Sequence, residues 1–331
     1  MPIAEAPRLI GNEQVSFVPI SYPDPAPGQI LLRVRANAVC GSDREIFAQG
    51  SDTIAGHEVA GEVAAVGPGA TVPIGARGVA FLMAYCGRCR NCQRGATNVC
   101  LDKSGDLGFN RDGGLGPFAL IDERVFFPVD DDIPFPLATM LLDVMGTSGH
   151  AMDRASLVRP DIESLYVAGA GPVGIGVLVM ARIRFGPDVP IRVSDVSPWR
   201  LEFAESLGAR PVHADRVDSI PLVDVAIDAS GRTSAREAAV ARLAKGGALI
   251  CVGHGQDLRL DVSPDLIATE RAVLGSEYFP FADLAHNLTL LREHRDTIAR
   301  VITHTYDVAE VGEAFRTFLS GQSGKVVVTQ A

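Results

Sequence analysis

Four cysteines lie close together in one short stretch of the chain. The segment CGRCRNCQRGATNVC, residues 86–100, has the spacing C-x2-C-x2-C-x7-C, and the 331-residue chain holds only two other cysteines, Cys40 and Cys251. Two C-x-x-C steps with a shared cysteine and a fourth cysteine one loop later are typical of a tetrahedral zinc site. Four thiolates leave zinc no open position for water, so we predict a structural site; the alternative is four free thiols in a surface loop. The predicted ligands are Cys86, Cys89, Cys92 and Cys100.

A glycine-rich turn is the second group of residues that could do chemistry. The segment GAGPVG has G-x-G-x-x-G spacing, follows the apolar run SLYVA and opens a segment with helical character. In that context the glycines permit a tight turn and close approach of a pyrophosphate, while the helix N-terminus offers unpaired N–H groups. We therefore predict a dinucleotide site; the alternative is an ordinary turn between a strand and a helix. The expected contacts in the turn are Gly169, Gly171, Pro172, Val173 and Gly174.

An acidic residue follows this turn at the distance expected for a ribose contact. Asp195 ends the next predicted strand, 21 residues after Gly174. A carboxylate there accepts hydrogen bonds from the ribose hydroxyls and repels a 2′-phosphate, which favours NAD over NADP. Arg200 either offers a positive charge near the ribose or is a solvated arginine on a helix face. Val252 and Gly253 end a later strand and are expected on the nicotinamide side.

The predicted elements divide the chain into β-rich and alternating parts. Residues 1–140 are rich in turns and short strands. The expected strands include 29–40, 57–67 and 76–82, and the predicted zinc lobe lies at about 84–103. Residues 141–280 alternate strands with helices, including helices at 172–184, 198–208 and 234–244 and a strand at 247–253, which predicts a parallel, doubly wound sheet. Residues 281–331 carry two helices, near 282–295 and 309–319, and a last strand. The predicted class is α/β with two domains.

Bulk composition narrows the possible partners and compartment. The formal net charge is −10 and no Lys/Arg cluster stands out, which argues against binding to nucleic acid or an anionic membrane. No apolar stretch reaches the about 18 residues of a membrane span. The start MPIAEAPRLI lacks the features of a secretory signal, so we expect a cytoplasmic protein whose clustered cysteines bind metal rather than form disulfides.

Two further segments place metal-binding side chains beside glycines. Cys40 lies in NAVCGSD, and His57 and Glu58 lie in AGHEVAG. Together with the cysteine lobe and the glycine-rich turn, these segments resemble the zinc-containing medium-chain dehydrogenase/reductase (alcohol dehydrogenase) family over essentially the whole chain. The similarity is strongest to its polyol, sorbitol and cyclitol dehydrogenase branch. It implies a GroES-like catalytic domain, a Rossmann domain and two zinc ions per chain, one catalytic and one structural.

The resemblance also assigns roles to individual residues. It implies that Cys40 and His57 bind the catalytic zinc. Glu58 would be a neighbouring carboxylate that binds the ion in some states or supports its ligands. Ser42 would link the substrate hydroxyl to a proton relay. The segment between Cys40 and His57 is only sixteen residues long, which leaves room for a bulky or cyclic substrate.

This sequence departs from the family pattern at two positions. The family places its third zinc ligand, a cysteine or a glutamate, seven residues before an H-A pair, and this chain has Asp143 there. We expect Asp143 to be the third ligand, directly or through water; the alternative is a helix cap. A histidine of the family's proton relay is replaced by Glu45, which either passes the proton, leaves that role to Asp43 and solvent, or is a surface residue.

The resemblance predicts an NAD- and zinc-dependent dehydrogenase that acts on a small-molecule alcohol or ketone. Substrates expected from it are secondary alcohols of polyols, sugars or cyclitols, and GDLGFNRDGG, residues 105–114, resembles stretches of polyol and aminocyclitol dehydrogenases. The alternatives are a zinc-free reductase of the same fold and a non-catalytic NAD(H)- or zinc-binding regulatory protein. A homodimer or homotetramer is expected through an edge of the nucleotide-binding sheet.

Overall fold

The computed structural model describes residues 3–331 and separates into two units, each with its own core. One unit runs to Leu142 and resumes at Pro280, and the other covers Asp143–Phe279. These junctions are adjacent to the boundaries expected near residues 140 and 280. Among the described residues, no helix has both the length and the apolar character needed to cross a membrane.

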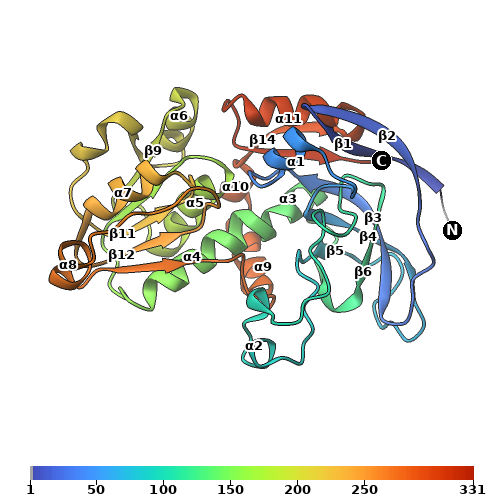
Figure 1. Cartoon of the computed structure of the whole chain (residues 1–331). Coiled ribbons are helices and arrows are strands. Elements are labelled where there is room, and N and C mark those ends of the chain that lie inside the picture. Colours follow the sequence, from blue (N-terminus) through green and yellow to red (C-terminus); the bar gives the residue numbers. More distant parts are fainter. Residues whose placement is uncertain (1–2) are drawn as a thin grey trace. The chain divides into compact units, whose positions relative to one another are not determined.

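The first unit contains a two-stranded hairpin, a seven-stranded mixed sheet and short helices (Figure 1). Its strands are β1 Ile3–Gly11, β2 Gln14–Ser21, β3 Gln29–Ala38, β4 Glu58–Val66, β5 Arg77–Ala80, β6 Phe118–Asp122, β7 Phe126–Pro128, β14 Ile302–Asp307 and β15 Lys325–Thr329. Its α-helices are α1 Asp43–Gln49, α2 Arg90–Gln93, α3 Phe135–Ala138, α9 Asp283–Glu293, α10 Arg295–Ala299 and α11 Val311–Leu319. Its 3-10 turns are η1 Thr97–Val99, η2 Glu123–Val125, η3 Thr139–Leu141 and η7 Val308–Glu310.

Residues from both ends of the chain build the core of this unit. The sheet order is β14-β15-β3-β4-β5-β7, with β6 also paired to β3, so the last strand lies beside the third. Helix α11 buries Val311, Ala314, Phe315 and Phe318, which the 3.6-residue repeat places on one face. Phe315 stacks on Phe47 of α1 at 4.7 Å between ring centroids. The C-terminal segment therefore closes the core over the region that carries Cys40.

The second unit is a six-stranded parallel sheet with helices between its strands. Its strands are β8 Leu165–Ala168, β9 Ile191–Asp195, β10 Arg210–His213, β11 Val223–Asp228, β12 Leu243–Cys251 and β13 Ala272–Gly275. Its helical segments are η4 Leu142–Thr147, which begins at the junction, α4 Ser148–Ser156, α5 Pro172–Phe185, α6 Pro198–Ser206, η5 Ala214–Ser219, α7 Thr233–Ala241, α8 Val262–Asp265 and η6 Ile267–Thr269.

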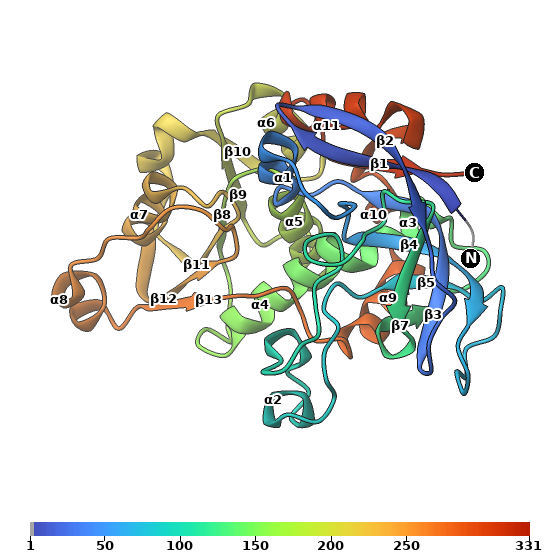
Figure 2. The same ribbon diagram turned by 45° about the vertical axis from the view of Figure 1, so that its right-hand side comes forward.

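The strand order of this sheet is β10-β9-β8-β11-β12-β13, and Figure 2 labels all six strands. Every neighbouring pair is parallel. The predicted doubly wound sheet is confirmed. The order reverses between β8 and β11, and such a switch point opens a crevice at the carboxyl ends of the strands where ligands bind.

One boundary in the second unit differs from the sequence-based expectation. Helix α7 ends at Ala241 and β12 begins at Leu243, whereas the helix was expected to reach residue 244 and the strand to begin at 247. Gly246 has φ +69° and a Cβ on Gly247 would lie 2.8 Å from the carbonyl oxygen of Asp224. The glycine pair therefore forms an irregularity inside the strand rather than marking its start.

Candidate metal centres and nucleotide site

The four cysteines of the lobe converge on one point. Their four sulfur atoms lie within 4.8 Å of one another, and Sγ of Cys86 is 4.0 Å from Sγ of Cys92. Sγ of Cys89 is also 4.0 Å from Sγ of Cys100. A tetrahedron with zinc–sulfur bonds of about 2.3 Å has sulfur–sulfur edges of about 3.8 Å, so this set fits a zinc ion. None of these cysteines forms a disulfide.

Backbone N–H groups favour the thiolate of Cys89, whereas burial disfavours that of Cys92. The N–H groups of Cys92 and Leu101 donate to Sγ of Cys89 at 3.5 Å and lower the pKa of that thiol to about 6. Burial, followed by the hydrogen bond with Cys89, raises the pKa of Cys92 to about 12. A divalent cation would favour the thiolate at both positions, because its charge compensates the burial of each sulfur.

The lobe is fastened to its own unit at the base. The guanidinium of Arg124 donates to the carbonyl oxygen of Cys86 at 2.6 Å. Phe281 packs its ring against Tyr85 at 5.7 Å, and its backbone N–H donates to Oγ1 of Thr97 at 2.8 Å. The lobe thus ties two distant parts of the first unit together, which is what a structural metal site can stabilise.

A second cluster unites the other predicted metal ligands. One ligand atom from each of its four residues lies within 4.8 Å of the others, and all four side chains are buried. Three of them come from the first unit, and the fourth directly follows Leu142, the residue before the junction. One thiol, one imidazole and two carboxylates are a donor set that suits zinc. The members are Cys40, His57, Glu58 and Asp143.

Asp43 supports the cysteine and the histidine of this cluster. One oxygen of its buried carboxylate accepts the backbone N–H of Cys40 at 2.9 Å. The other oxygen lies 3.4 Å from Nδ1 of His57, which leaves Nε2 as the nitrogen for a metal ion. Sequence reasoning considered Asp43 only as a proton carrier. The sequence shows an acidic side chain at the position where α1 begins. It does not show the contact of this side chain with His57.

Glu58 is paired with a lysine from the last strand. Oε1 of Glu58 accepts a hydrogen bond from Nζ of Lys325, and both side chains have 0% exposure. Lysine is almost never fully buried without a partner, so this ion pair is the reason that Lys325 is tolerated at the start of β15. Sequence reasoning missed Lys325. Its position directly before the apolar run VVV was the signal that a charged side chain enters the core.

The segment that carries Asp143 is a short π-helix. Residues Leu142–Thr147 adopt i→i+5 hydrogen bonding, a rare geometry that often occurs at functional sites. Oγ1 of Thr147 donates to Oδ1 of Asp143 at 3.2 Å. A π-helical turn is wider than an α-helical turn. The position of the Asp143 carboxylate therefore depends on this turn as well as on the length of the side chain. Asp143 lies inside the π-helical turn rather than at a helix N-cap.

Ser42 and Glu45 lie at the start of α1 near Cys40. Ser42 is the exposed residue before the helix, and Glu45 is exposed and accepts a hydrogen bond from Nε2 of Gln49 at 2.9 Å. The relay roles proposed for Ser42 and Glu45 stay predictions.

The segment 105–114 packs against the turn that presents His57. The ring of Phe109 lies 5.0 Å from the imidazole of His57, and Oδ1 of Asp112 accepts the N–H of Ile54 at 2.9 Å. A Cβ on Gly108 would lie 2.6 Å from the carbonyl oxygen of Gly56, so only glycine permits this approach. This segment therefore supplies one wall beside the predicted metal ligands.

The glycine-rich turn has the geometry that its spacing predicts. Gly169 follows β8 with φ +99°, a left-handed conformation that favours glycine. A Cβ on Gly174 would lie 1.8 Å from the carbonyl oxygen of Gly169, so α5 approaches the strand as closely as it does only because this side chain is absent. Pro172 is the first residue of α5 and Val173 the second. The N-terminus of α5 is thereby held over the end of β8.

Asp195 and Arg200 lie beside this turn. The carboxylate of Asp195 accepts the N–H of Ala170 at 2.8 Å and that of Ser197 at 2.9 Å, so it joins the end of β9 to the glycine-rich turn. Asp195 is partly exposed, and each carboxylate oxygen has a second lone pair that a ribose hydroxyl could use. A Cβ on Gly171 would lie 4.0 Å from the guanidinium of Arg200. Arg200 is therefore near the predicted phosphate position as well as the ribose position.

Val252 and Gly253 directly follow β12, at the carboxyl edge of the sheet. The N–H groups of both residues donate to the carbonyl oxygen of Asp228 at 2.9 Å. His254 is exposed beside them, and a hydrogen bond with Glu277 raises the pKa of its imidazole. Cys251 occupies the last position of β12, and burial raises the pKa of its thiol, which disfavours the reactive thiolate form.

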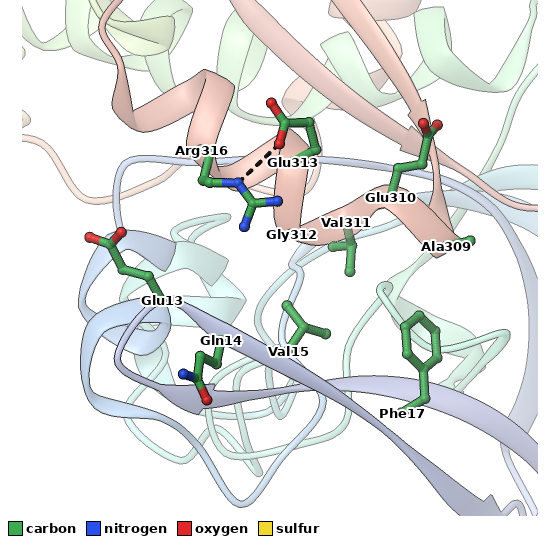
Figure 3. A pocket seen from close by; sticks show the side chains of 10 residues that line it. All are labelled: Glu13, Gln14, Val15, Phe17, Ala309, Glu310, Val311, Gly312, Glu313 and Arg316. Carbon is green, nitrogen blue, oxygen red and sulfur yellow. Dashed lines mark hydrogen bonds and ion pairs between the residues drawn. The ribbon is translucent and has the colours of Figure 1, made fainter.

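A cavity of about 470 Å³ lies elsewhere in the first unit, between the β1–β2 hairpin and α11 (Figure 3). Two of its acidic groups are already engaged. Glu313 pairs with Arg316 at 2.9 Å, and Glu310 accepts the N–H of Asp307 at 3.4 Å. None of the ten residues that line this cavity belongs to the predicted site, so the chemistry is not expected there.

Comparison with known proteins defines the class of this chain. The family model for the alcohol dehydrogenase GroES-like domain matches residues 26–131, and the model for zinc-binding dehydrogenases matches residues 172–293. The L-threonine 3-dehydrogenase of Shewanella woodyi is 30% identical over 343 residues, which cover 97% of this chain and 98% of that protein. The chain belongs to the zinc-containing medium-chain dehydrogenase/reductase family, whose members are zinc-type alcohol dehydrogenase-like oxidoreductases.

Two further similarities extend over nearly the whole chain. YphC of Escherichia coli (strain K12), described as an uncharacterized zinc-type alcohol dehydrogenase-like protein, is 28% identical over 351 residues and covers 98% of each chain. The solved structure of a thermostable alcohol dehydrogenase from Pyrobaculum aerophilum matches with a TM-score of 0.85 and 26% identity, over 98% of this chain and 99% of that one. The GroES-like and Rossmann-like architecture inferred from the sequence is thus confirmed.

Proposed function

We propose that this oxidoreductase uses zinc and NAD to interconvert a secondary alcohol and a ketone of a polyol, sugar or cyclitol. The observation that carries the proposal is the buried cluster of one thiol, one imidazole and two carboxylates, with its ligand atoms within 4.8 Å of one another. A structural four-cysteine site elsewhere in the chain cannot do this chemistry, because it leaves no open position.

The proposed ligands balance the charge of a zinc ion. A Cys40 thiolate and an Asp143 carboxylate contribute two negative charges, His57 is neutral, and Lys325 compensates Glu58. When bound, zinc would lower the pKa of the substrate hydroxyl and polarise the carbonyl, and the nicotinamide ring would exchange the hydride.

The remaining residues orient ligands and move the proton. Asp43 keeps the imidazole of His57 turned with Nδ1 toward itself and fixes the backbone of Cys40. The Ser42 hydroxyl would accept the proton of the substrate hydroxyl while it gives its own proton to Glu45, or to Asp43 and solvent. Phe109 beside His57 would limit access of water from its side.

Recognition of NAD is proposed for the second unit. The glycine-rich turn and the N-terminus of α5 would receive the pyrophosphate, and Asp195 would accept hydrogen bonds from the adenosine ribose. Arg200 near Gly171 would add a positive charge to the same region. Asp195 supports NAD over NADP, because a 2′-phosphate would meet its carboxylate.

Zinc content tests the metal part of the proposal. We expect close to two zinc ions per chain in protein purified without added metal, and close to one in the Asp143→Ala variant. Asp161→Ala, which removes a carboxylate exposed at 68%, is the matched control and should retain two. One ion in the parent protein would contradict a loaded catalytic site, and two ions in Asp143→Ala would contradict only the ligand role of Asp143.

The substrate class needs a separate assay. Polyols, cyclitols and L-threonine are compared as substrates with NAD by following NADH absorbance. Turnover of polyols or cyclitols at a higher kcat/KM than L-threonine supports the proposed class. The opposite order would assign this chain the reaction named for its Shewanella woodyi relative and reject the polyol proposal.

We also propose a homodimer or homotetramer. Strands β10 and β13 form the two edges of the six-stranded sheet, so each has one side unpaired within the chain. Light scattering coupled to size-exclusion chromatography distinguishes these assemblies from a 35.0 kDa monomer.

A further inference from the structure

Two loops at the carboxyl edge of the six-stranded sheet pack against each other through their backbones. The β11 loop comprises residues 229–232 and the β12 loop residues 252–257. A Cβ on Gly231 would lie 2.0 Å from the carbonyl oxygen of His254, and one on Gly253 would lie 2.5 Å from the backbone nitrogen of Gly231. The N–H of Gln256 donates to the carbonyl oxygen of Gly231 at 2.8 Å. The shape of one loop therefore depends on the other.

A buried carboxylate organises the β11 loop. Asp228 ends β11 with 0% exposure, and its Oδ1 accepts the N–H of Ser230 at 2.9 Å, the hydroxyl of Ser230 at 2.6 Å and the N–H of Gly231 at 3.2 Å. Three donors on one oxygen fix the turn directly after the strand. A charge this deeply buried requires a partner of opposite sign.

That partner is Arg236 of α7, which also holds the β12 loop. Its side chain is 10% exposed, and its Nε donates to Oδ2 of Asp228 at 2.7 Å. Its two terminal nitrogens donate to the carbonyl oxygens of Gly253 and Gln256. One planar guanidinium thus joins the end of β11 to both ends of the turn after β12. A lysine ammonium carries the same charge but cannot span these three acceptors.

The contacts of Arg236 with Asp228 and the β12 loop lie on the β11 side of the switch point. The glycine-rich turn and Asp195 lie at the ends of β8 and β9, on one side of the switch point, where the adenosine half of a dinucleotide binds. Strands β11 and β12 lie on the other side, so their loops face the other half of the same ligand. A change in the β12 loop should therefore affect the two halves of the cofactor unequally.

We propose that Arg236 is a positioning residue that holds residues 253–256 in the shape that receives the nicotinamide half of the cofactor. This inference rests on the proposed function. Arg236 does not contact the cofactor in this proposal; it acts through the two carbonyl groups and through Asp228.

The test compares a ligand that occupies both halves of the site with one that occupies only the adenosine half. Kd values for NADH and AMP are measured by calorimetry on the full-length parent and on Arg236→Gln. Arg236→Gln loses the hydrogen bonds that a charged donor makes to the β12 loop, so part of the binding energy of NADH must then be used to order this loop. We therefore expect the NADH Kd to rise about tenfold or more. The AMP Kd should stay within about twofold, because distant sites are nearly independent.

Two further variants separate positioning from general stability. Arg236→Lys retains the positive charge beside Asp228 and should fold. It should still weaken the binding of NADH more than the binding of AMP. Arg242→Gln is the matched control, because Arg242 also donates to a backbone carbonyl, that of Asp218 at 2.9 Å, but away from the β12 loop. It should leave both Kd values unchanged.

Equal weakening of NADH binding and AMP binding would overturn the positioning role. An NADH Kd that is unchanged in Arg236→Gln or in Arg236→Lys would also overturn it. A parent protein that binds AMP but not NADH would instead overturn the proposed function on which this inference rests. The two failures are therefore distinguishable in one set of titrations.

Discussion

At the scale of single residues, three of the buried charged groups that the structure describes have defined partners. Glu58 is paired with Lys325, Asp43 lies between His57 and the backbone of Cys40, and Arg236 neutralises Asp228. Removing a charge from water costs several kcal/mol, and the cost is recovered only where geometry and hydrogen bonds are good. Each of these pairs is therefore most sensitive to the loss of one partner alone.

The Glu58–Lys325 pair gives a prediction at this scale. Lys325→Met leaves a buried carboxylate without its cation and should lower the free energy of unfolding by about 3–5 kcal/mol. The double variant Glu58→Gln/Lys325→Met removes both charges and should recover most of that loss. Urea denaturation of the metal-saturated proteins measures both values. A double variant as unstable as Lys325→Met would show that packing, and not the unpaired charge, causes the loss.

At the scale of elements, close backbone approaches decide where the helices and loops lie. The contact between α5 and β8 depends on Gly174, and the contact between segment 105–114 and the turn before His57 depends on Gly108. In both places a side chain would meet backbone atoms, which cannot rotate away. These elements therefore have little freedom to move apart without loss of the site.

Gly174→Ala tests the closest of these approaches. The new Cβ would lie 1.8 Å from the carbonyl oxygen of Gly169, so α5 must shift. We expect a loss of about 1–3 kcal/mol in stability and a marked loss of NADH affinity. Gly275→Ala is the control, because nothing lies within 4 Å of its added methyl group. Calorimetric titration with NADH and thermal melts compare the two, and equal NADH affinities would show that the turn does not hold the pyrophosphate.

At the scale of the whole molecule, the predicted metal ligands and the predicted nucleotide-binding features belong to different parts of the chain. All four lobe cysteines and three of the four buried residues predicted to bind metal lie in the first unit, whereas the glycine-rich turn, Asp195 and Arg236 lie in the second. Each unit has its own core. Loss of metal should therefore reduce activity and the stability of the first unit without removing the nucleotide site.

Metal removal by a chelator tests this separation. We expect loss of dehydrogenase activity as zinc is removed, a lower melting temperature once the lobe is emptied, and an NADH Kd within about twofold of the starting value. Zinc content, activity and NADH titration are followed on the same samples. A parallel loss of NADH affinity and zinc would show that the two parts are coupled.

The sequence by itself determined the features that have a local signature. Cysteine spacing predicted the lobe, glycine spacing predicted the turn after β8, and alternating apolar segments predicted the parallel sheet, because each pattern arises within a few tens of residues. The residues Cys40, His57, Glu58 and Asp143 were also named from short segments and a family resemblance.

The tertiary structure decided which distant side chains complete the site. Lys325 meets Glu58 across 267 positions of sequence, the carboxylate of Asp43 turns toward His57, and Arg236 reaches two loops that follow different strands. Contacts of this kind have no periodicity and no fixed spacing. The Lys325 contact depends on the pairing of the last strand with the third, and the Arg236 contacts depend on the packing of α7 along β11 and β12, so the fold had to be known before these residues could be assigned a role.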